Sequence, residues 1–593
     1  MKKSVTFLMP LCFILLLTEN VYSQSTSLHT LFDNYYEDKL KLFPLLATSY
    51  GDYRYNDMLL NDGSAQFIQQ LNNFYDKYLV ELKQYNEESL GITDRISYEL
   101  LKFLLRTGKE LLSYHPEYIP VTQIKYLPTG LSVPFSLAIW GAGKSVQPFN
   151  TLKDYDDWLK RIAAFPDWVD TAITNFNKGI KAGVVLPRSL VLKMIPQMEQ
   201  LAEPDTSKNI FFGPVKNFPE SFTATQRTEL INAYYKAITT NLILSYKRMA
   251  FFLRNEYLPY ARSTSGYNTL PNGKTLYSFY VRLYTTTNKT PEEIYKIGQN
   301  EVNIIHKEME RIKNETGFKG TLQQFYKFLT TDSSLLPFKK PQDVLDAYNA
   351  ILQKIQPHLP ELFDVQPKTP FIIKQTEAFR AASAIEEYIN GTPDGKRPGT
   401  FYVPVVDATK YPSFTMEDVF LHEAIPGHHY QVSLESEDTS LPLFRRKTIV
   451  PAFVEGWGLY AETLGKQLGA YTSPYQYMGF LQDNIHRAIR LVVDVGVHTG
   501  KMTREEAIKY MTDNEPVSED FAVAEVERYM AWPGQALSYK IGELKIEELR
   551  DKYKAQLGDK FSLKKFHDAV LKGGALPLTV FENYMSNWAQ SQK

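Results

Sequence analysis

Residues 290–312 read TPEEIYKIGQNEVNIIHKEMERI. Apolar residues recur in this stretch every three or four positions between charged ones, which is the pattern of a helix with one buried face. Thr290 and Glu293 have the spacing of a capping box, and Pro291 suits the first position of a helix. The stretch therefore predicts an amphipathic helix over Pro291–Ile312.

The same apolar spacing is found along much of the chain. Three further segments show it: Leu28–Leu42, Phe67–Tyr85 and Thr228–Arg254. Thr503 and Ser473-Pro474 mark two more helix starts. Strand-like runs are few, and Thr400–Val406, with its β-branched and aromatic residues, predicts one short edge strand. We therefore expect a mainly α fold, a large multi-helical body with a few short strands.

The composition is that of a folded globular protein. Of the 593 residues, 44% are hydrophobic and 22% are charged. Lys and Arg number 66 against 67 Asp and Glu, and the net charge of -1 provides no general electrostatic attraction to nucleic acid. The one cysteine, Cys12, excludes a disulfide scaffold and a multi-cysteine metal site. A metal site in this chain must therefore use imidazoles and carboxylates.

The N-terminus has the features of a secretory signal peptide. Lys2 and Lys3 precede the apolar run Val5–Leu17, and Ser23-Gln24 suits cleavage, so we expect residues 1–23 to be removed. The apolar run is too short for a transmembrane helix of about 20 residues. Its retention as an anchor is the alternative. We expect a periplasmic or secreted protein with no stable membrane span after cleavage.

A boundary between two helical lobes is expected near residues 260–285, where turn-forming residues gather. The mature chain would then divide into an N-terminal helical lobe, residues 24–275, and a C-terminal helical lobe, residues 276–593. The alternative is one continuous helical body with an ordinary surface loop at this point.

The candidate chemistry begins at residues 422–429, which read HEAIPGHH. A His-Glu pair on a helix with a second His nearby is typical of zinc peptidases, in which two imidazoles hold the metal and the Glu activates water. His422 and His428 are six residues apart and would not share one face of an ideal helix. His429 returns to that face but lies about 10 Å along the axis. A break at Pro426-Gly427 is therefore expected, and we favour His428 over His429 as the second ligand.

The third metal ligand is expected from residues 453–462, FVEGWGLYAE. Glu455 and Glu462, seven apart, lie on nearly the same face of this apolar segment, and buried carboxylates are costly unless they are paired or bind a metal. Gly456 and Gly458 are expected to allow close packing against the histidine helix. Two His and one Glu with an open position form a catalytic zinc set, so we expect Zn²⁺.

These two strings resemble those of a large bacterial family of predicted helical metallopeptidases that has long been classed as a domain of unknown function. The resemblance covers nearly the whole mature chain. More distantly, the chain is similar to gluzincin oligopeptidases and carboxypeptidases with the motif His-Glu-x-Gly-His, and it carries two extra residues before Gly427-His428. The resemblance implies a metallopeptidase-like body with a substrate cleft, zinc held by His422, His428 and Glu455, support from Glu462, and a peptide substrate.

A polar stripe follows in the sequence. Arg490, Asp494 and His498 are spaced four and four and share one face of a predicted apolar helix. We expect an internal Arg490–Asp494 salt bridge, and a catalytic role for His498 as a donor to the developing oxyanion. Tyr539 is expected to be a second such donor because tyrosine and histidine donors are usual in the resembled peptidases. Arg528-Tyr529 are further candidates.

The sequence therefore predicts an exported zinc-dependent peptidase that hydrolyses oligopeptides, with Glu423 as the general base on a metal-activated water. Two alternatives stay open. One is an exported helical protein that binds peptides or glycans and holds a structural metal. The other is a metal-dependent hydrolase that acts on a non-peptide amide or ester.

Overall fold

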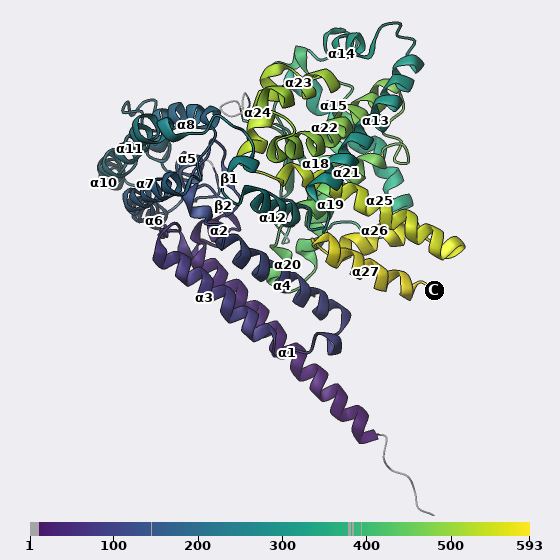
Figure 1. Ribbon diagram of the computed structural model, residues 1–593, viewed down its shortest axis with the longest axis horizontal. Coiled ribbons are helices and arrows are strands. Elements are labelled where there is room, and N and C mark those ends of the chain that lie inside the picture. The colour runs from purple at the N-terminus through teal and green to yellow at the C-terminus, as the bar shows by residue number, and fades with distance from the viewer. Residues whose placement is uncertain (1–10, 144, 378–380, 382–384, 393) are drawn as a thin grey trace, which may run out of the picture.

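The computed structural model describes residues 11–143, 145–377, 381, 385–392 and 394–593, and this part of the chain is mainly helical. In Figure 1, helices α5 to α11 gather on one side, the helices from α13 onward form a larger body on the other, and α12 lies between them. The expected mainly α fold with a few short strands is confirmed.

The helices fall into three stretches of the chain. The first contains α1 (Leu11–Leu42), α2 (Pro44–Ser49), α3 (Ala65–Leu82), α4 (Ile92–Leu112), α5 (Val133–Gly141), α6 (Leu152–Ala163), α7 (Phe165–Ala182), α8 (Arg188–Leu201), α9 (Gly213–Lys216), α10 (Ala224–Ala237) and α11 (Leu244–Phe252). The second contains α12 (Gly273–Thr285), α13 (Pro291–Glu315), α14 (Leu322–Thr331), α15 (Pro341–Ile355) and α16 (Leu359–Leu362). The third contains α18 (Met416–Glu423), α19 (His428–Glu437), α20 (Leu443–Arg446), α21 (Pro451–Thr463), α22 (Pro474–Thr499), α23 (Arg504–Asn514), α24 (Glu519–Ala531), α25 (Ser538–Leu557), α26 (Leu563–Lys572) and α27 (Leu578–Ser591).

Several helices begin at side chains that cap their first turn. The Thr290 hydroxyl accepts a hydrogen bond from the Glu293 backbone N–H at 3.2 Å, and the Glu293 carboxylate accepts one from the Thr290 backbone N–H at 2.8 Å. The same two bonds form at Thr503 and at Ser473. These bonds satisfy N–H groups that the first turn of a helix leaves unpaired, and the three helix starts predicted from the sequence are confirmed.

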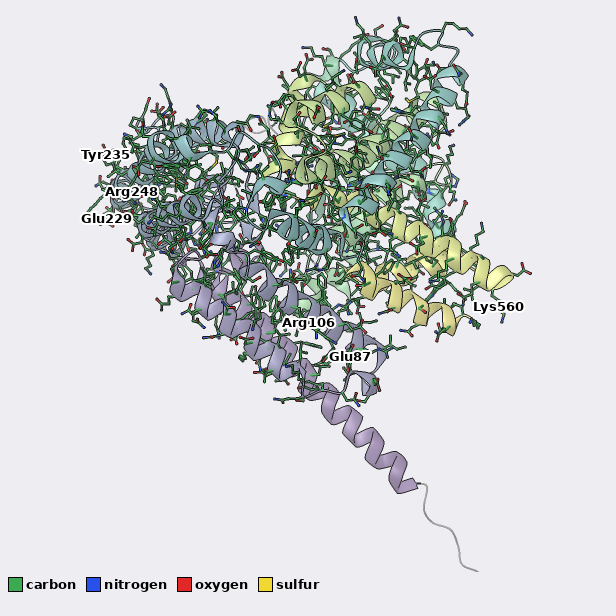
Figure 2. The ribbon with its side chains drawn as sticks, in the orientation of Figure 1. Glu87, Arg106, Glu229, Tyr235, Arg248 and Lys560 are labelled. Atoms are coloured by element: carbon green, nitrogen blue, oxygen red, sulfur yellow. The ribbon has the colours of Figure 1, made fainter. Side chains whose placement is uncertain are left out.

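The long helix expected over Thr228–Arg254 is interrupted by wider turns. It consists of α10, a π-helical segment Ile238–Ile243 and α11, and it ends in a second π-helical segment, Leu253–Tyr257. Its buried face includes Tyr234 and Tyr246. Figure 2 shows three exposed residues of this segment at the outer edge of the molecule: Glu229, Tyr235 and Arg248.

The described strands form two small sheets. β1 (Tyr126–Leu127) and β2 (Gly130–Leu131) make a short antiparallel pair. In the other sheet, β5 (Gly399–Val403) pairs in parallel with β3 (Phe371–Gln375) and antiparallel with β4 (Glu387–Ile389), in the order β3-β5-β4. The expectation of an edge strand near residue 400 is wrong, because β5 is the central strand and four of its five residues are buried.

Two apolar clusters hold the described helices together. One joins α1, α3 and α4 to α12 and to α18, α21 and α25 to α27. The other joins α5 to α8, α10 and α11 to α13, α14 and α22 to α24. Each cluster draws on both sides of the expected boundary at residue 275. The division into lobes 24–275 and 276–593 stays a prediction.

Helix α22 runs through the larger body and is buried over its second half. Every residue from Ala488 to His498 is buried, which explains why this segment is apolar apart from the stripe of Arg490, Asp494 and His498. Gly298 of α13 lies against it so closely that a Cβ there would come within 2.6 Å of the Leu491 Cβ. Helices α21 and α25 pack against each other in the same way, through Gly456 and Gly542. These two close approaches position the elements of the candidate site.

The expected signal peptide, residues 1–23, lies partly outside the described residues. Helix α1 begins at Leu11, and its first part projects beyond the body of the molecule in Figure 1. Cleavage after Ser23 stays a prediction. Within the described part of the chain, no helix combines the length and the apolar character that crossing a membrane requires.

Candidate metal centre

The helix is interrupted between His422 and His428 of the HEAIPGHH stretch. Helix α18 ends at Glu423, a cis Ile425–Pro426 bond follows, and α19 begins at His428. The turn folds so tightly that a Cβ on Gly427 would lie 1.9 Å from the carbonyl oxygen of His422, so only glycine fits there. The predicted break is confirmed, and it brings the ring centroids of His422 and His428 to 4.8 Å.

Glu455 of α21 faces both imidazoles. The Nε2 atoms of His422 and His428 each lie 3.8 Å from the same Glu455 Oε2. One ligand atom from each of His422, Glu423 and His428 also lies within 4.8 Å of the others. The structure therefore brings together the three metal ligands and the general base that the sequence predicts.

His429 points elsewhere. Its Nδ1 lies 2.9 Å from the hydroxyl oxygen of Tyr388 and 3.3 Å from that of Ser433, and its ring packs against Phe371 of β3. Of the two histidines left open by the sequence, His428 is the one that faces Glu455.

The ring of His422 is held from two sides. Its Nδ1 is hydrogen-bonded to the buried carboxylate of Glu462 at 2.6 Å, which leaves Nε2 toward Glu455 and His428. On the other side the ring lies on Gly458, where a Cβ would come within 2.7 Å of His422 Cε1. Carboxylate–histidine pairs of this kind fix the orientation of metal-binding imidazoles. The expected close packing of Gly458 against the histidine helix is confirmed.

Gly456 has a different role from the one expected. A Cβ at this position would lie 2.5 Å from the backbone of Gly542, so Gly456 allows α25, and not the histidine helix, to approach α21. The two glycines lie about 200° apart around the helix axis and face different neighbours. The expectation that both pack against the histidine helix is therefore wrong for Gly456.

The donor set fits zinc. Zinc in catalytic sites takes three protein ligands, commonly two imidazoles and one carboxylate, at about 2.0–2.2 Å. Tetrahedral ligands at those distances lie about 3.3 Å from one another, so the 3.8 Å separations of the two His Nε2 atoms from Glu455 Oε2 need to close by roughly 0.5 Å. His422, His428 and Glu455 could hold Zn²⁺ after this small movement.

Burial and neighbouring charges set the protonation of these groups. Burial alone would lower the pKa of His422, but the carboxylates of Glu455 and Glu462 raise it to about 10. Burial and the charge of His422 lower the pKa of His428 to about 4. Burial would raise the pKa of Glu455, yet the two histidines and Arg490 keep it below its ordinary value. In the absence of metal, the His422 imidazole is therefore protonated at neutral pH, and its positive charge lies among carboxylates.

Glu423 lies beside the metal ligands and is held by β4. The Tyr388 backbone N–H donates to Glu423 Oε2 at 3.0 Å. Burial raises the pKa of the Glu423 carboxyl to about 7, against the opposing charge of His422. A carboxyl that titrates near neutral pH suits a general base that must both accept and release a proton.

His498 is not brought to this group. Its Nδ1 accepts from the Tyr267 backbone N–H at 3.3 Å, and its Nε2 lies 3.0 Å from the Tyr529 carbonyl oxygen, to which it donates. The residue is 1% exposed, and burial lowers its pKa to about 3. Because backbone groups take both ring nitrogens, His498 joins α22 to neighbouring segments and offers no free donor to an oxyanion.

The expected Arg490–Asp494 salt bridge does not form. Arg490 donates to Glu525 Oε2 at 3.1 Å, whereas Asp494 accepts from the Tyr277 hydroxyl at 2.6 Å and from the Gly534 backbone N–H. The two side chains share a helix face but reach different neighbours. Burial raises the pKa of Asp494 to about 7.

Tyr539 lies beside Arg490. The Arg490 guanidinium lies over its ring, 4.7 Å from the centroid. Burial and the charge of Glu455 raise the pKa of Tyr539, so its hydroxyl stays protonated at neutral pH. Tyr539 thus interacts electrostatically with Glu455, whereas the hydrogen bonds of His498 are to backbone groups.

Several residues around Arg490 were missed or left undefined by the sequence. Glu525 is bound by Arg490, Arg528 and Tyr529, and its spacing of three and four from the last two is the helical signal that could have identified it. The Tyr388 N–H that holds Glu423 had no such signal, because it depends on strand pairing about 35 residues upstream.

Comparison with known proteins gives a family and two similar folds. Residues 44–585 match the family described as "Bacterial protein of unknown function (DUF885)". The crystal structure of a candidate lipoprotein from Colwellia psychrerythraea is 26% identical, with a TM-score of 0.85, over 96% of this chain and 99% of that one. A candidate lipoprotein of unknown function from Shewanella oneidensis is 18% identical, with a TM-score of 0.73, over 94% and 99%. No curated protein matches the chain.

Proposed function

We propose that this chain, which belongs to the DUF885 family of bacterial proteins of unknown function, is an exported zinc-dependent peptidase. The observation that carries the proposal is the approach of His422 Nε2 and His428 Nε2 to one oxygen of Glu455, each at 3.8 Å, with Glu423 beside them. Structural zinc sites normally have four protein ligands. Three ligands and an adjacent carboxylate instead favour a site that leaves one position open for a reactant.

The residues of the site divide into three roles. His422, His428 and Glu455 would hold the metal, and Glu462 would keep the His422 ring in place through its hydrogen bond to Nδ1. A bound Zn²⁺ would supply Lewis acidity, which polarises a carbonyl group and makes water more acidic. Glu423 would perform the proton transfers.

Glu423 is suited to move a proton in both directions. As a carboxylate it would take the proton of the water that attacks the scissile carbonyl carbon, and as a carboxylic acid it would pass that proton to the leaving amine. Its pKa of about 7 in the metal-free protein and the hydrogen bond from the Tyr388 N–H support this role. Tyr539 would donate its hydroxyl proton in a hydrogen bond to the carbonyl oxygen as negative charge develops there.

Export is supported by two observations. The N-terminal 23 residues have the pattern of a signal peptide. Both similar structures come from proteins described as candidate lipoproteins, which are exported proteins. We propose a periplasmic or secreted location, with oligopeptides as substrates.

The direct test is mass spectrometry of a mixed peptide library after incubation with the purified mature protein. We expect cleavage products that disappear on chelation and return with Zn²⁺. The Glu423→Gln variant should keep its zinc and lose cleavage by about 10²- to 10⁴-fold, the usual contribution of general acid–base catalysis. A fully active Glu423→Gln variant would refute the assignment of Glu423 as the general base. Products from ester or non-peptide amide substrates alone would favour a different hydrolase, and peptide binding without turnover would favour a binding protein.

A further inference from the structure

Arg490 has a charged donor with no partner. The residue is 9% exposed, its Nε donates to the Tyr529 hydroxyl oxygen at 3.2 Å, and its Nη2 donates to Glu525 Oε2 at 3.1 Å. The Nη1 atom is shielded from solvent and makes no hydrogen bond. A buried donor without an acceptor lowers stability, and more so when the group is charged. The Nη1 of Arg490 is therefore available to an acceptor.

The guanidinium of Arg490 is fixed in place by its neighbours. Arg528 donates two hydrogen bonds to Glu525, from Nε at 2.9 Å and from Nη2 at 3.0 Å, and its Nη1 donates to Gln535 at 2.8 Å. The Tyr529 hydroxyl donates to Glu525 Oε2 at 2.6 Å. All donor groups of Arg528 that face this network are paired, so Glu525 is held firmly and holds Arg490 in turn. Among the described residues around Glu525, two nitrogens make no hydrogen bond: Arg490 Nη1 and His486 Nε2, which lies 3.4 Å from Glu525 Oε2.

Arg490 is connected with the metal centre through Tyr539 and Glu455. The carbon of its guanidinium group lies over the ring of Tyr539, 4.7 Å from the centroid. The charge of Arg490 helps to lower the pKa of Glu455, a proposed metal ligand, and the charge of Glu455 raises the pKa of Tyr539. Arg490, on α22, is therefore an electrostatic neighbour of the proposed metal ligand Glu455.

Three basic side chains share the Glu525 carboxylate. Arg490 and Arg528 are paired with it, and His486, whose Nδ1 lies 2.7 Å from Glu515, has its Nε2 3.4 Å from Glu525. A planar guanidinium binds carboxylates better than it binds neutral carbonyl groups, because the bonds are charge-assisted and two can form in parallel. In a peptide main chain at neutral pH, the C-terminal carboxylate is the negatively charged group.

We infer that Arg490 binds the C-terminal carboxylate of the peptide substrate beside the metal centre, so that the protein acts at the C-terminal ends of peptides. This inference rests on the proposed function, because it names the substrate class of the same site. Arg490 would therefore determine specificity, and the bonds from Glu525 and Tyr529 would orient it.

The test compares the binding of three acetylated alanine tripeptides by calorimetry. One is the free acid, one is its C-terminal amide, and one is an amide whose last residue is aspartate. All proteins carry Glu423→Gln, which suppresses turnover. The free acid should bind about 10- to 100-fold more tightly than the plain amide, the range expected for hydrogen bonds to a charged group. Adding Arg490→Gln should bring the two affinities within about twofold of each other.

Arg504→Gln is the matched control. Arg504 is also partly buried and paired with a glutamate, Glu527, but it takes no part in the metal centre. It should leave the ratio of acid to amide affinity unchanged. Equal affinities for the acid and the amide would overturn the inference without any Arg490 variant, which matters if Arg490→Gln fails to fold. An unchanged ratio in a folded Arg490→Gln protein would overturn it too, and so would an aspartate amide that binds as well as the free acid.

The inference and the proposed function fail in different ways. If the protein with Glu423 intact cleaves no peptide of the library while the acid still binds better than the amide through Arg490, the peptidase proposal fails and the carboxylate site stands. If the protein cleaves peptides but binds acid and amide equally, the peptidase proposal stands and the role of Arg490 is refuted.

Discussion

Replacing Gly458 with alanine tests whether the orientation of His422 controls the metal centre. The added Cβ would lie 2.7, 2.9 and 3.0 Å from the Cε1, Nε2 and Nδ1 atoms of His422. Ordinary contacts between such atoms are about 3.5–4.0 Å, so the ring must move by about 1 Å. The Gly458→Ala variant therefore perturbs one metal ligand without changing a polar group.

The expected effect follows from what that movement disturbs. His422 Nδ1 is only 2.6 Å from Glu462, and a 1 Å displacement is enough to weaken or break this hydrogen bond. Loss of such a supporting contact typically lowers metal affinity by about 10- to 100-fold. Overpacking of a buried site typically lowers the free energy of unfolding by about 1–3 kcal/mol. Zinc affinity should therefore fall more than stability alone explains.

The assay is a competition titration of zinc against a chromophoric chelator, together with denaturant unfolding of the metal-free protein. Gly456→Ala is the matched control, because its Cβ would press on the Gly542 backbone of α25 and away from His422. It should lower stability while the folded protein keeps an affinity for zinc close to that of the unsubstituted protein. The reasoning would be refuted if Gly458→Ala bound zinc normally, or if both variants lost zinc affinity in proportion to their lost stability.

Three further predictions concern other residues. Glu462→Gln should lower zinc affinity about 10- to 100-fold in the same titration, because the charged partner of His422 is lost; unchanged affinity would contradict the role of Glu462. His428→Gln should abolish stoichiometric zinc by metal analysis while His429→Gln retains it, and the reverse pattern would reassign the second ligand. The pKa of Asp494 is raised to about 7 in the folded protein, so the folded state binds this proton more tightly than the unfolded state does. The resulting stabilisation is complete below about pH 4 and is lost as the pH rises to about 7. The free energy of unfolding of the unsubstituted protein should fall relative to that of Asp494→Asn by up to about 1.4 kcal/mol per unit between about pH 5 and 7, and denaturant titrations that show a pH-independent difference would contradict this.

The helices and their starts could be predicted because their signals are local. A capping box such as Thr290–Glu293 and apolar residues at three- and four-residue spacing act within one or two turns. The position of β5 in its sheet could not be predicted in the same way, since it depends on pairing with β3 and β4. A run of β-branched residues indicates a strand but not its neighbours.

The close approach of His422, His428 and Glu455 could be predicted from residue types and the break at Pro426-Gly427. The structure does not bring His498 to the site, because it lies too far along α22 from Arg490. Arg490 and His498 share a helix face, but eight residues separate them by about 12 Å along α22. One end of the stripe therefore reaches Tyr539 near the metal centre, while the other reaches the backbone of Tyr267. Periodicity predicts on which face of a helix a side chain lies but not which residue it contacts.

The central claim is that one zinc ion, held by His422, His428 and Glu455, makes the protein a peptidase. The most direct measurement is a titration of Zn²⁺ into the metal-depleted mature protein, with peptide cleavage followed at each addition. We predict that the cleavage rate starts near zero, rises in proportion to the zinc bound and saturates at one ion per chain. Cleavage at the full rate by the metal-free protein, or saturation with zinc without any cleavage, would contradict the claim.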